Sequence, residues 1–332
     1  MDPVHRSRPW SRTAGGVARR RPLGRRAVPA GAPSRERPAC RRGRPTVHCV
    51  IDGSEPPAAP PALPGDGAAW LPVTTGESGA AVFRSADGTR YAKCVAARDA
   101  EELEAERDRV AWLSGHGVPG PQVLDWQTGS AGARLVTSAV PGVPADQVSA
   151  ADLLAAWERI AAAVRGLHDV PVRQCPFRRD VDGMVAVARD VVARGAVNPA
   201  FLSTGQQRTP PAELLARLVP QLPLRREQEA ADAVVCHGDL CLPNIVLDPR
   251  TLDVSGFIDL GRLGRADRHA DLALLLADAR HSWKDEERAR AADTAFAESY
   301  GVVLDHDRLR FYLHLDPLTW PRRPSSPPAG AA

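Results

Sequence analysis

Residues 237–259 read HGDLCLPNIVLDPRTLDVSGFID, and this stretch decides the fold expected for the chain. An acidic residue, Asp239, is followed five positions later by an amide, Asn244, and fifteen positions after that by another acidic residue, Asp259. Two short apolar runs lie between Asn244 and Asp259, and a turn-rich Asp-Pro-Arg separates them. This pattern predicts a β-hairpin with polar side chains at its two outer ends.

Kinases use the same spacing of an Asp, an Asn and a second Asp for phosphoryl transfer. In that layout Asp239 accepts the proton of the attacking hydroxyl, while Asn244 and Asp259 hold Mg²⁺ on the phosphates of ATP. The alternative is that Asp239 and Asn244 belong only to a turn. Because the spacing, the paired strands and the second Asp all agree, we expect the kinase chemistry.

A lysine upstream fits the same layout. The chain has two lysines, Lys93 and Lys284, against forty-one arginines, and Lys93 lies in a predicted strand at 90–95. Kinases place a compact ammonium group at this point on the α and β phosphates. The alternative is an exposed lysine on a surface strand. A predicted helix at 99–113 contains four glutamates, one of which would pair with Lys93.

Strands and turns indicate a small sheet before the hairpin. A Gly-bearing turn at 74–79 would bring backbone N–H groups close to phosphate oxygens. Residues 137–142, which include Pro141 and Gly142, mark a hinge between this sheet and the rest of the chain. Five strands are predicted, at 70–73, 81–84, 90–95, 122–126 and 133–137.

Helices dominate the chain beyond the hinge. Ser149 is a predicted N-cap with Asp152 three residues later, and an apolar stripe to Leu167 indicates a long helix. His168, at the end of that helix, is interpreted as a C-terminal cap. Further helices are predicted at 181–194, 212–218, 268–279, 284–300 and 307–315.

Charge divides unevenly along the 332 residues. The net charge is +3, but residues 1–50 hold thirteen arginines against two acidic residues, so this segment carries +11 and the remainder −8. An acidic body favours a small cationic substrate over a nucleic acid. Residues 1–65 are rich in Arg, Pro, Gly and Ala and show no periodicity, which predicts disorder. The alternative is a start site assigned too far upstream.

Cysteine usage predicts a cytoplasmic protein. The six cysteines form no CxxC pair and no cluster with zinc spacing, so reduced thiols are expected. No apolar run is long enough to span a bilayer, so no membrane association is expected. We also expect a monomer.

Several segments together resemble the aminoglycoside phosphotransferases, from about residue 70 to residue 320. They are HGDLCLPN at 237–244 and GFIDLGRLGRADRHADLAL at 256–274. The likeness is closest to the streptomycin 3''-phosphotransferase branch, through WLPVTTGESG at 70–79, NPAFL at 198–202 and LDPLTW at 315–320.

The resemblance implies an α+β, protein-kinase-like fold of two lobes. Residues 66–140 would form a small N-lobe, an antiparallel sheet with one helix, that binds the nucleotide. Residues 141–321 would form a larger, mainly helical C-lobe that holds the catalytic and substrate-binding residues. A tail at 322–332 is expected to be disordered.

The resemblance also assigns individual residues. It selects Glu106 as the partner of Lys93, and it places Ser78 and Gly79 over the phosphates. Ala139 matches a hinge position that binds adenine. Asp316 matches a position that contacts substrate, although Pro317 stands where many relatives supply a second carboxylate, which favours the streptomycin branch.

The function that follows is ATP- and Mg²⁺-dependent phosphorylation of a cationic aminoglycoside, namely streptomycin at its 3''-hydroxyl, which would confer resistance. One alternative is a kinase of the same fold that acts on another aminoglycoside or on a small metabolite. A second is a nucleotide-binding pseudokinase or scaffold, but retention of Lys93, Asp239, Asn244 and Asp259 argues against it.

Overall fold

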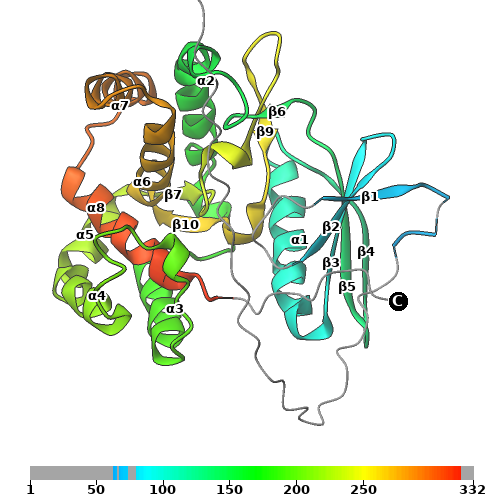
Figure 1. Cartoon of the computed structure of the whole chain (residues 1–332), viewed down its shortest axis with the longest axis horizontal. Coiled ribbons are helices and arrows are strands. Elements are labelled where there is room, and N and C mark those ends of the chain that lie inside the picture. The colour runs from blue at the N-terminus through cyan, green and yellow to red at the C-terminus, as the bar shows by residue number, and fades with distance from the viewer. Residues whose placement is uncertain (1–62, 66, 74–79, 323–332) are drawn as a thin grey trace, which may run out of the picture. The chain divides into compact units, whose positions relative to one another are not determined.

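The computed structural model of the chain describes residues 63–65, 67–73 and 80–322. An antiparallel sheet with one helix, here called the N-lobe, is followed by a mainly helical C-lobe (Figure 1). The two-lobed α+β fold expected from the sequence is therefore confirmed. The extension at 1–65 and the tail at 322–332, both expected to be disordered, lie almost wholly outside the described residues.

Within the described residues, five strands form the N-lobe sheet in the order β1-β2-β3-β5-β4, and all neighbours are antiparallel. The central strand β3 places Lys93 opposite Val82 on one side and Leu135 on the other. Two neighbouring strands therefore fix the backbone of Lys93. The strands are β1 (Trp70–Val73), β2 (Ala81–Ser85), β3 (Arg90–Val95), β4 (Val123–Gly129) and β5 (Gly132–Ser138).

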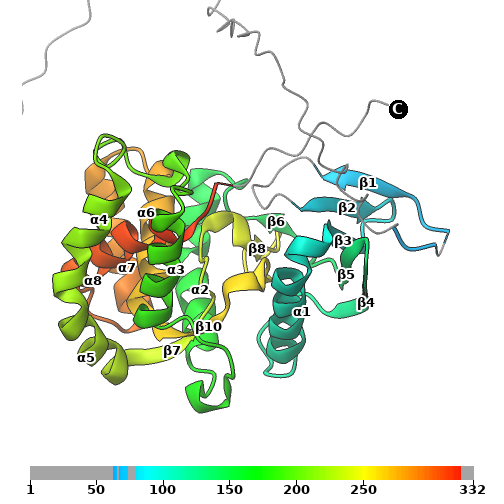
Figure 2. The ribbon, with the colours of Figure 1, turned by 90° about the horizontal axis from the view of Figure 1, so that it is seen from below.

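One helix, α1 (Ala100–Ser114), lies between the sheet and the C-lobe (Figures 1 and 2). Leu103 packs with Val95 and Leu135 of the sheet. Val110 and Leu113, two turns further along the same face, belong to the core of the C-lobe. Because α1 contributes to both apolar cores, it holds its side chains in a defined position between the lobes.

The C-lobe is built from seven helices within the described part of the chain. Ser149 caps the first of them as predicted, since its hydroxyl accepts a hydrogen bond from the N–H of Asp152. Trp157 donates its indole N–H to the carbonyl of Ala292 over 2.8 Å and so joins α2 to α7. The helices are α2 (Ala150–His168), α3 (Val181–Ala193), α4 (Pro211–Leu218), α5 (Leu222–Asp232), α6 (Arg268–Ala279), α7 (Glu286–Tyr300) and α8 (His306–Leu315).

One helix of the C-lobe was not foreseen, and the interpretation of His168 was wrong. Helix α5 was not predicted, because only Leu222 and Arg225 are buried in it and no apolar stripe marks it in the sequence. His168 is not a helix cap: its ring is buried and contacts the hydroxyl of Tyr300 at 2.6 Å and a carboxylate oxygen of Asp271 at 3.1 Å. The end of α2 lies inside the lobe, so side chains of α6 and α7 surround it.

Short strands carry the loops of the site. The predicted hairpin is present as β8 (Ile245–Leu247) and β9 (Val254–Phe257), and β6 (Val143–Pro144) pairs with β8. A separate pair, β7 (Ala233–Cys236) and β10 (Gly264–Asp267), was not expected. β7 ends directly before His237 and β9 shortly before Asp259, so both loops emerge from fixed strands.

No helix in the described ranges is both long enough and apolar enough to cross a bilayer. The four cysteines among these residues, Cys94, Cys175, Cys236 and Cys241, are free thiols.

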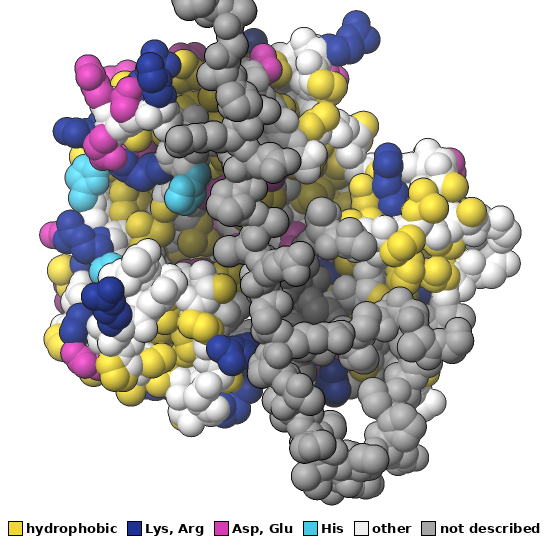
Figure 3. Space-filling view, in the orientation of Figure 1, with side chains coloured by type: hydrophobic (Ala, Val, Ile, Leu, Met, Phe, Trp, Pro, Cys, Tyr) yellow, Lys and Arg dark blue, Asp and Glu magenta, His cyan; other side chains and the backbone are white. Residues whose placement is uncertain are grey.

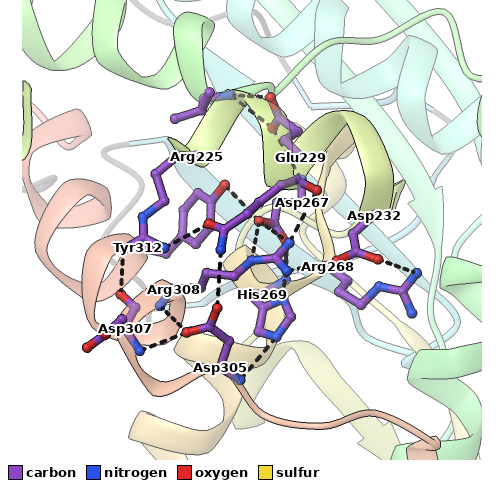
Figure 4. Close-up of polar contacts among 12 residues, drawn as sticks. Arg225, Glu229, Asp232, Asp267, Arg268, His269, Asp305, Asp307, Arg308 and Tyr312 are labelled. Atoms are coloured by element: carbon purple, nitrogen blue, oxygen red, sulfur yellow. Dashed lines mark hydrogen bonds and ion pairs between the residues drawn. The ribbon is translucent and has the colours of Figure 1, made fainter. Parts of the chain in front are cut away.

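A buried polar network joins α5, α6 and α8 (Figure 4). Asp267 caps α6, since one of its oxygens accepts the backbone N–H of His269. Its other oxygen accepts two N–H groups of Arg308, at 3.0 and 2.6 Å. Arg308 also binds Asp232 at 2.7 Å. These contacts give Asp267 a structural role, because a buried carboxylate needs such partners.

Glu229 of α5 anchors two other elements from the same network. One of its oxygens accepts the backbone N–H groups of both Val181, at 3.0 Å, and Asp267, at 3.2 Å. These bonds connect α5 to the start of α3 and to the end of β10. Burial raises the pKa of Glu229 to about 7, and the nearby charges of Asp180 and Asp267 act in the same direction.

We predict that Glu229→Gln alters the pH dependence of stability. The pKa of Glu229 is higher in the folded protein than in the unfolded chain, so its contribution to stability is fully present below about pH 4.5. That contribution is lost as the pH rises toward 7. The free energy of unfolding of the wild type should therefore fall relative to Glu229→Gln by about 1–2 kcal/mol between pH 5 and 8, after allowance for partial exposure.

Denaturant titrations at each pH measure this difference. Glu227→Gln, an exposed change on the same helix, is the matched control and should leave the pH profile unchanged. Parallel profiles for the wild type and Glu229→Gln would contradict the prediction.

Candidate active site

Lys93 brings the two lobes together at one ammonium group. Its Nζ lies 2.7 Å from Oε2 of Glu106 on α1 and 3.3 Å from Oδ1 of Asp259 in the C-lobe. Burial opposes the positive charge, but the two carboxylates outweigh that effect and raise the pKa of Lys93. Lys93 is therefore a fixed cation at the junction of the lobes.

The position of Glu106 follows from the phase of α1. Glu106 lies three residues after Leu103 and four before Val110, and both of these are buried. Residues spaced by three or four share one face of a helix. Glu106 consequently points inward with the apolar stripe. This phase distinguishes it from Glu101 and Glu104, which are exposed.

Asp239 and Asn244 lie together in the loop after β7. The side-chain amide of Asn244 donates to the backbone carbonyl of Asp239 at 2.8 Å and approaches its Oδ2 at 3.4 Å. The N–H of Ile258 donates to the carbonyl of Asn244, which ties the loop to the strand leading to Asp259. Burial raises the pKa of Asp239, with further contributions from Asp316 and Asp259.

His237 supports this loop from inside. Its Nε2 donates to the carbonyl of Ile258 over 2.9 Å, and its Nδ1 accepts the N–H of Asp239 at 3.3 Å. Both ring nitrogens are thus engaged by backbone groups, as a neutral imidazole allows. His237 therefore holds the loop, and the role of Asp239 as proton acceptor stays a prediction.

Asp271 is a residue of the site that the sequence reasoning missed. Its two carboxylate oxygens accept the backbone N–H groups of His237, at 2.6 Å, and Gly238, at 2.9 Å. Burial opposes its charge, but the hydrogen bond and charge of His168 outweigh this effect and lower the pKa of Asp271. The available signal was an acidic residue, Asp271, directly before the apolar run of α6, where a buried carboxylate requires partners.

Asp259 has an unusual backbone conformation. Its φ of 60° and ψ of 57° lie in the left-handed region, which residues other than glycine rarely adopt. The Lys93 ammonium holds the pKa of Asp259 below its usual range. About half of the side chain, 46%, is exposed. A strained backbone that carries a charged and accessible carboxylate is typical of a functional position.

The predicted nucleotide contacts are described only in part. Ser78 and Gly79 lie outside the described residues. The N–H of Ala139 donates to the carbonyl of Thr89 over 2.8 Å, so this N–H is not available to an adenine base. Contact between Ala139 and adenine stays a prediction, and the group of Ala139 left to make it is the backbone carbonyl. Among the described residues, none accepts the N–H of the next residue, Val140.

Asp316 lies beside the catalytic loop but is already paired. One oxygen accepts Nη2 of Arg179 at 2.7 Å, and the other accepts the indole N–H of Trp320 at 2.9 Å. Arg262 lies 3.6 Å from the first oxygen, and its guanidinium stacks over the Trp320 ring. The positive charges of Arg179 and Arg262 therefore balance the negative charge of Asp316. Contact between Asp316 and a substrate stays a prediction. Arg262 also donates to the hydroxyl and the carbonyl oxygen of Thr319.

A glycine is required at position 238, where the catalytic loop passes close to Arg179 and Arg262. Its φ is +84°, and a Cβ at this position would overlap the carbonyl oxygen of Arg262 and lie 2.6 Å from Cδ of Arg179. The glycine therefore allows the catalytic loop to approach the segment that binds Asp316.

We predict that Gly238→Ala lowers the free energy of unfolding by at least about 2 kcal/mol and kcat by at least tenfold, because both the conformation and the close approach are lost. Gly117→Ala is the matched control, since Gly117 has a φ of +71° but nothing within 4 Å of its Cβ position. It should cost only the strain of the left-handed conformation, about 1–2 kcal/mol, and leave kcat unchanged. Equal effects of the two variants on both quantities would contradict the role of close approach.

Comparisons with known proteins agree with this geometry. The family model described as the phosphotransferase enzyme family matches residues 69–312. The streptomycin 3''-kinase of Streptomyces griseus is 71% identical over 271 residues, which are 82% of this chain and the whole of that protein. An aminoglycoside 3'-phosphotransferase of Streptomyces fradiae is 41% identical, over 74% of this chain and 94% of that protein.

A solved structure is similar over most of its length. Aminoglycoside phosphotransferase APH(3'')-Id from Streptomyces rimosus, in complex with ADP and streptomycin, has 63% sequence identity and a TM-score of 0.74, and the match covers 77% of this chain and 94% of that one. The family resemblance read from the sequence is confirmed. The chain belongs to the aminoglycoside phosphotransferases of the phosphotransferase enzyme family.

Proposed function

We propose that this protein transfers the γ-phosphoryl group of ATP to the 3''-hydroxyl of streptomycin. The observation that carries the proposal is the 71% identity to the entire streptomycin 3''-kinase of Streptomyces griseus. The structure supports it independently, because Lys93, Asp239, Asn244 and Asp259 lie around one region at the junction of the lobes.

Asp239 is the proposed acceptor of the proton from the substrate hydroxyl. The bond between the γ-phosphorus and the bridging oxygen of ATP breaks, the hydroxyl oxygen forms the new P–O bond, and ADP leaves. The raised pKa of Asp239 suits this role, since a base with a pKa closer to the working pH is more effective. Asp271 and His237 orient Asp239 through the backbone of the loop.

Lys93 is proposed to bind the α and β phosphates of the nucleotide. Glu106 fixes its ammonium group at 2.7 Å, so little reorientation is needed when a phosphate binds. We extend the proposal to Ser78 and Gly79 over the phosphates and to Ala139 at the hinge, as the resemblance implies.

The residues present also fit Mg²⁺. The amide nitrogen of Asn244 is engaged with Asp239, which orients its amide oxygen the other way, and Asp259 offers an accessible carboxylate. Oxygen atoms from an amide and a carboxylate are ligands that Mg²⁺ prefers. Asn244 and Asp259 would hold the ion, which when bound neutralises charge on the phosphates.

We predict that Asp259→Ala and Asn244→Ala both raise the Mg²⁺ concentration needed for half-maximal activity, with the larger effect for Asp259. A carboxylate contributes a full charge to a hard cation, whereas an amide contributes only a dipole. Asp248→Ala, an exchange in the exposed hairpin turn, is the control. Titration of activity with Mg²⁺ measures the effect, and an unchanged midpoint for both variants would argue against this pair as ligands.

The choice of streptomycin depends on the acceptor side of the site, whereas substrate charge favours aminoglycosides in general. The acidic body of the chain attracts polycations, which include all aminoglycosides. Pro317 removes a second carboxylate next to Asp316, which favours the streptomycin branch. We also propose a cytoplasmic monomer that confers resistance and has neither a nucleic-acid nor a membrane partner.

A coupled assay of ADP release tests the proposed function. We predict that kcat/KM for streptomycin exceeds that for kanamycin or neomycin by at least tenfold, about 1.4 kcal/mol of transition-state stabilisation.

Asp239→Ala should lower kcat at least about a hundredfold while nucleotide affinity stays nearly intact. Preference for kanamycin would indicate the aminoglycoside alternative, and nucleotide binding without drug-dependent ADP release would indicate a pseudokinase.

A further inference from the structure

A buried cation on α5 lacks a counter-charge. Arg225 is 4% exposed, and no carboxylate of the described residues lies within ion-pair distance of it. Its guanidinium donates only to neutral oxygens, namely the side-chain oxygens of Gln221 and Gln228 and the carbonyl of Asp307. It also lies over the ring of Phe311 at 5.2 Å.

Arg308, the neighbouring buried arginine, has the carboxylate partners that Arg225 lacks. Arg308, 6% exposed and in the same view, binds the carboxylates of both Asp267 and Asp232 (Figure 4). A buried charge is costly unless it is paired, and neutral hydrogen bonds compensate only part of that cost. Arg225 is therefore incompletely satisfied by the described residues, and an anion beside it would complete its environment.

A cavity adjoins Arg225. Its volume is about 280 Å³, close to the smallest ligand pockets, and it is lined by Gln221, Arg225, Asp307, Arg310, Phe311 and His314. A smaller cavity of about 120 Å³ shares Gln221 and His314 and adds Leu214 and Leu218 as an apolar wall. On this face of the C-lobe, over α4, α5 and α8, basic and histidine side chains border apolar surface (Figure 3).

The lining of the larger cavity has a positive balance. Arg225 and Arg310 carry two positive charges, and the one carboxylate present, Asp307, pairs with Arg310 at 2.9 Å. His314 adds an imidazole that has no hydrogen-bond partner within the described residues. The polar groups therefore favour an anion, and Leu214 and Leu218 favour an apolar body attached to it.

We propose that this cavity binds a small organic anion, with its anionic group between Arg225 and Arg310 and its apolar part against Leu214 and Leu218. A phosphate monoester and a carboxylate share this chemistry. The site is separate from the proposed kinase site, because none of its lining residues belongs to the groups around Lys93 and Asp239.

Calorimetric titration of the full chain tests the proposal, with ADP and Mg²⁺ present to fill the nucleotide site. The probes are phenyl phosphate, benzoate and, as a neutral control, benzyl alcohol. We expect at least one of the two anions to bind with a Kd below about 10 mM and the alcohol not to bind. Stronger binding of phenyl phosphate would identify a phosphate site, and stronger binding of benzoate a carboxylate site.

Variants locate the binding. Arg310→Glu should weaken it at least tenfold, whereas Asp307→Asn should strengthen it, because it frees Arg310 and removes a negative charge. Arg290→Glu, an exposed change on α7, is the matched control and should bind like the wild type. All three positions are exposed, so folding is expected to survive. Failure of both anions to bind the wild type, or equal affinities in Arg310→Glu and Arg290→Glu, would overturn the proposal whatever the kinase activity.

Discussion

The buried carboxylate of Asp271 is the constraint on which the site depends. It accepts the backbone N–H groups of His237 and Gly238, so the catalytic loop is attached to α6 and not only to its neighbours in sequence. An unpaired carboxylate at this depth would be very costly, and the loop is therefore held wherever α6 is held. His168 and Tyr300 complete the network behind Asp271 and connect it to α2 and α7.

A second constraint joins the lobes. Lys93 is fixed by the central strand of the N-lobe, and its ammonium group contacts one carboxylate on α1 and another, Asp259, in the C-lobe. Because α1 packs into both apolar cores, the nucleotide side and the catalytic side share one rigid support. Phosphoryl transfer requires positioning more than covalent participation by the protein, and this arrangement supplies it.

Local sequence was enough for some of these features and not for others. Asp239, Asn244 and Asp259 could be proposed because they stand at fixed spacings around one predicted hairpin, and Lys93 because lysine is so rare in this chain. Glu106 could have been chosen from its phase with Leu103 and Val110. The pairing of Arg179 with Asp316 could not be foreseen, since 137 residues separate them and only the tertiary fold brings them together.

We propose that this geometry directs phosphate to one hydroxyl of one drug, streptomycin. Location of the phosphate on the product of the purified enzyme, ATP and streptomycin by ³¹P–¹H correlation NMR tests that claim most directly. We expect phosphorus to couple to the proton at the 3'' position of the N-methylglucosamine ring, at a single site. Phosphate on the 6-hydroxyl of the streptidine ring would contradict it.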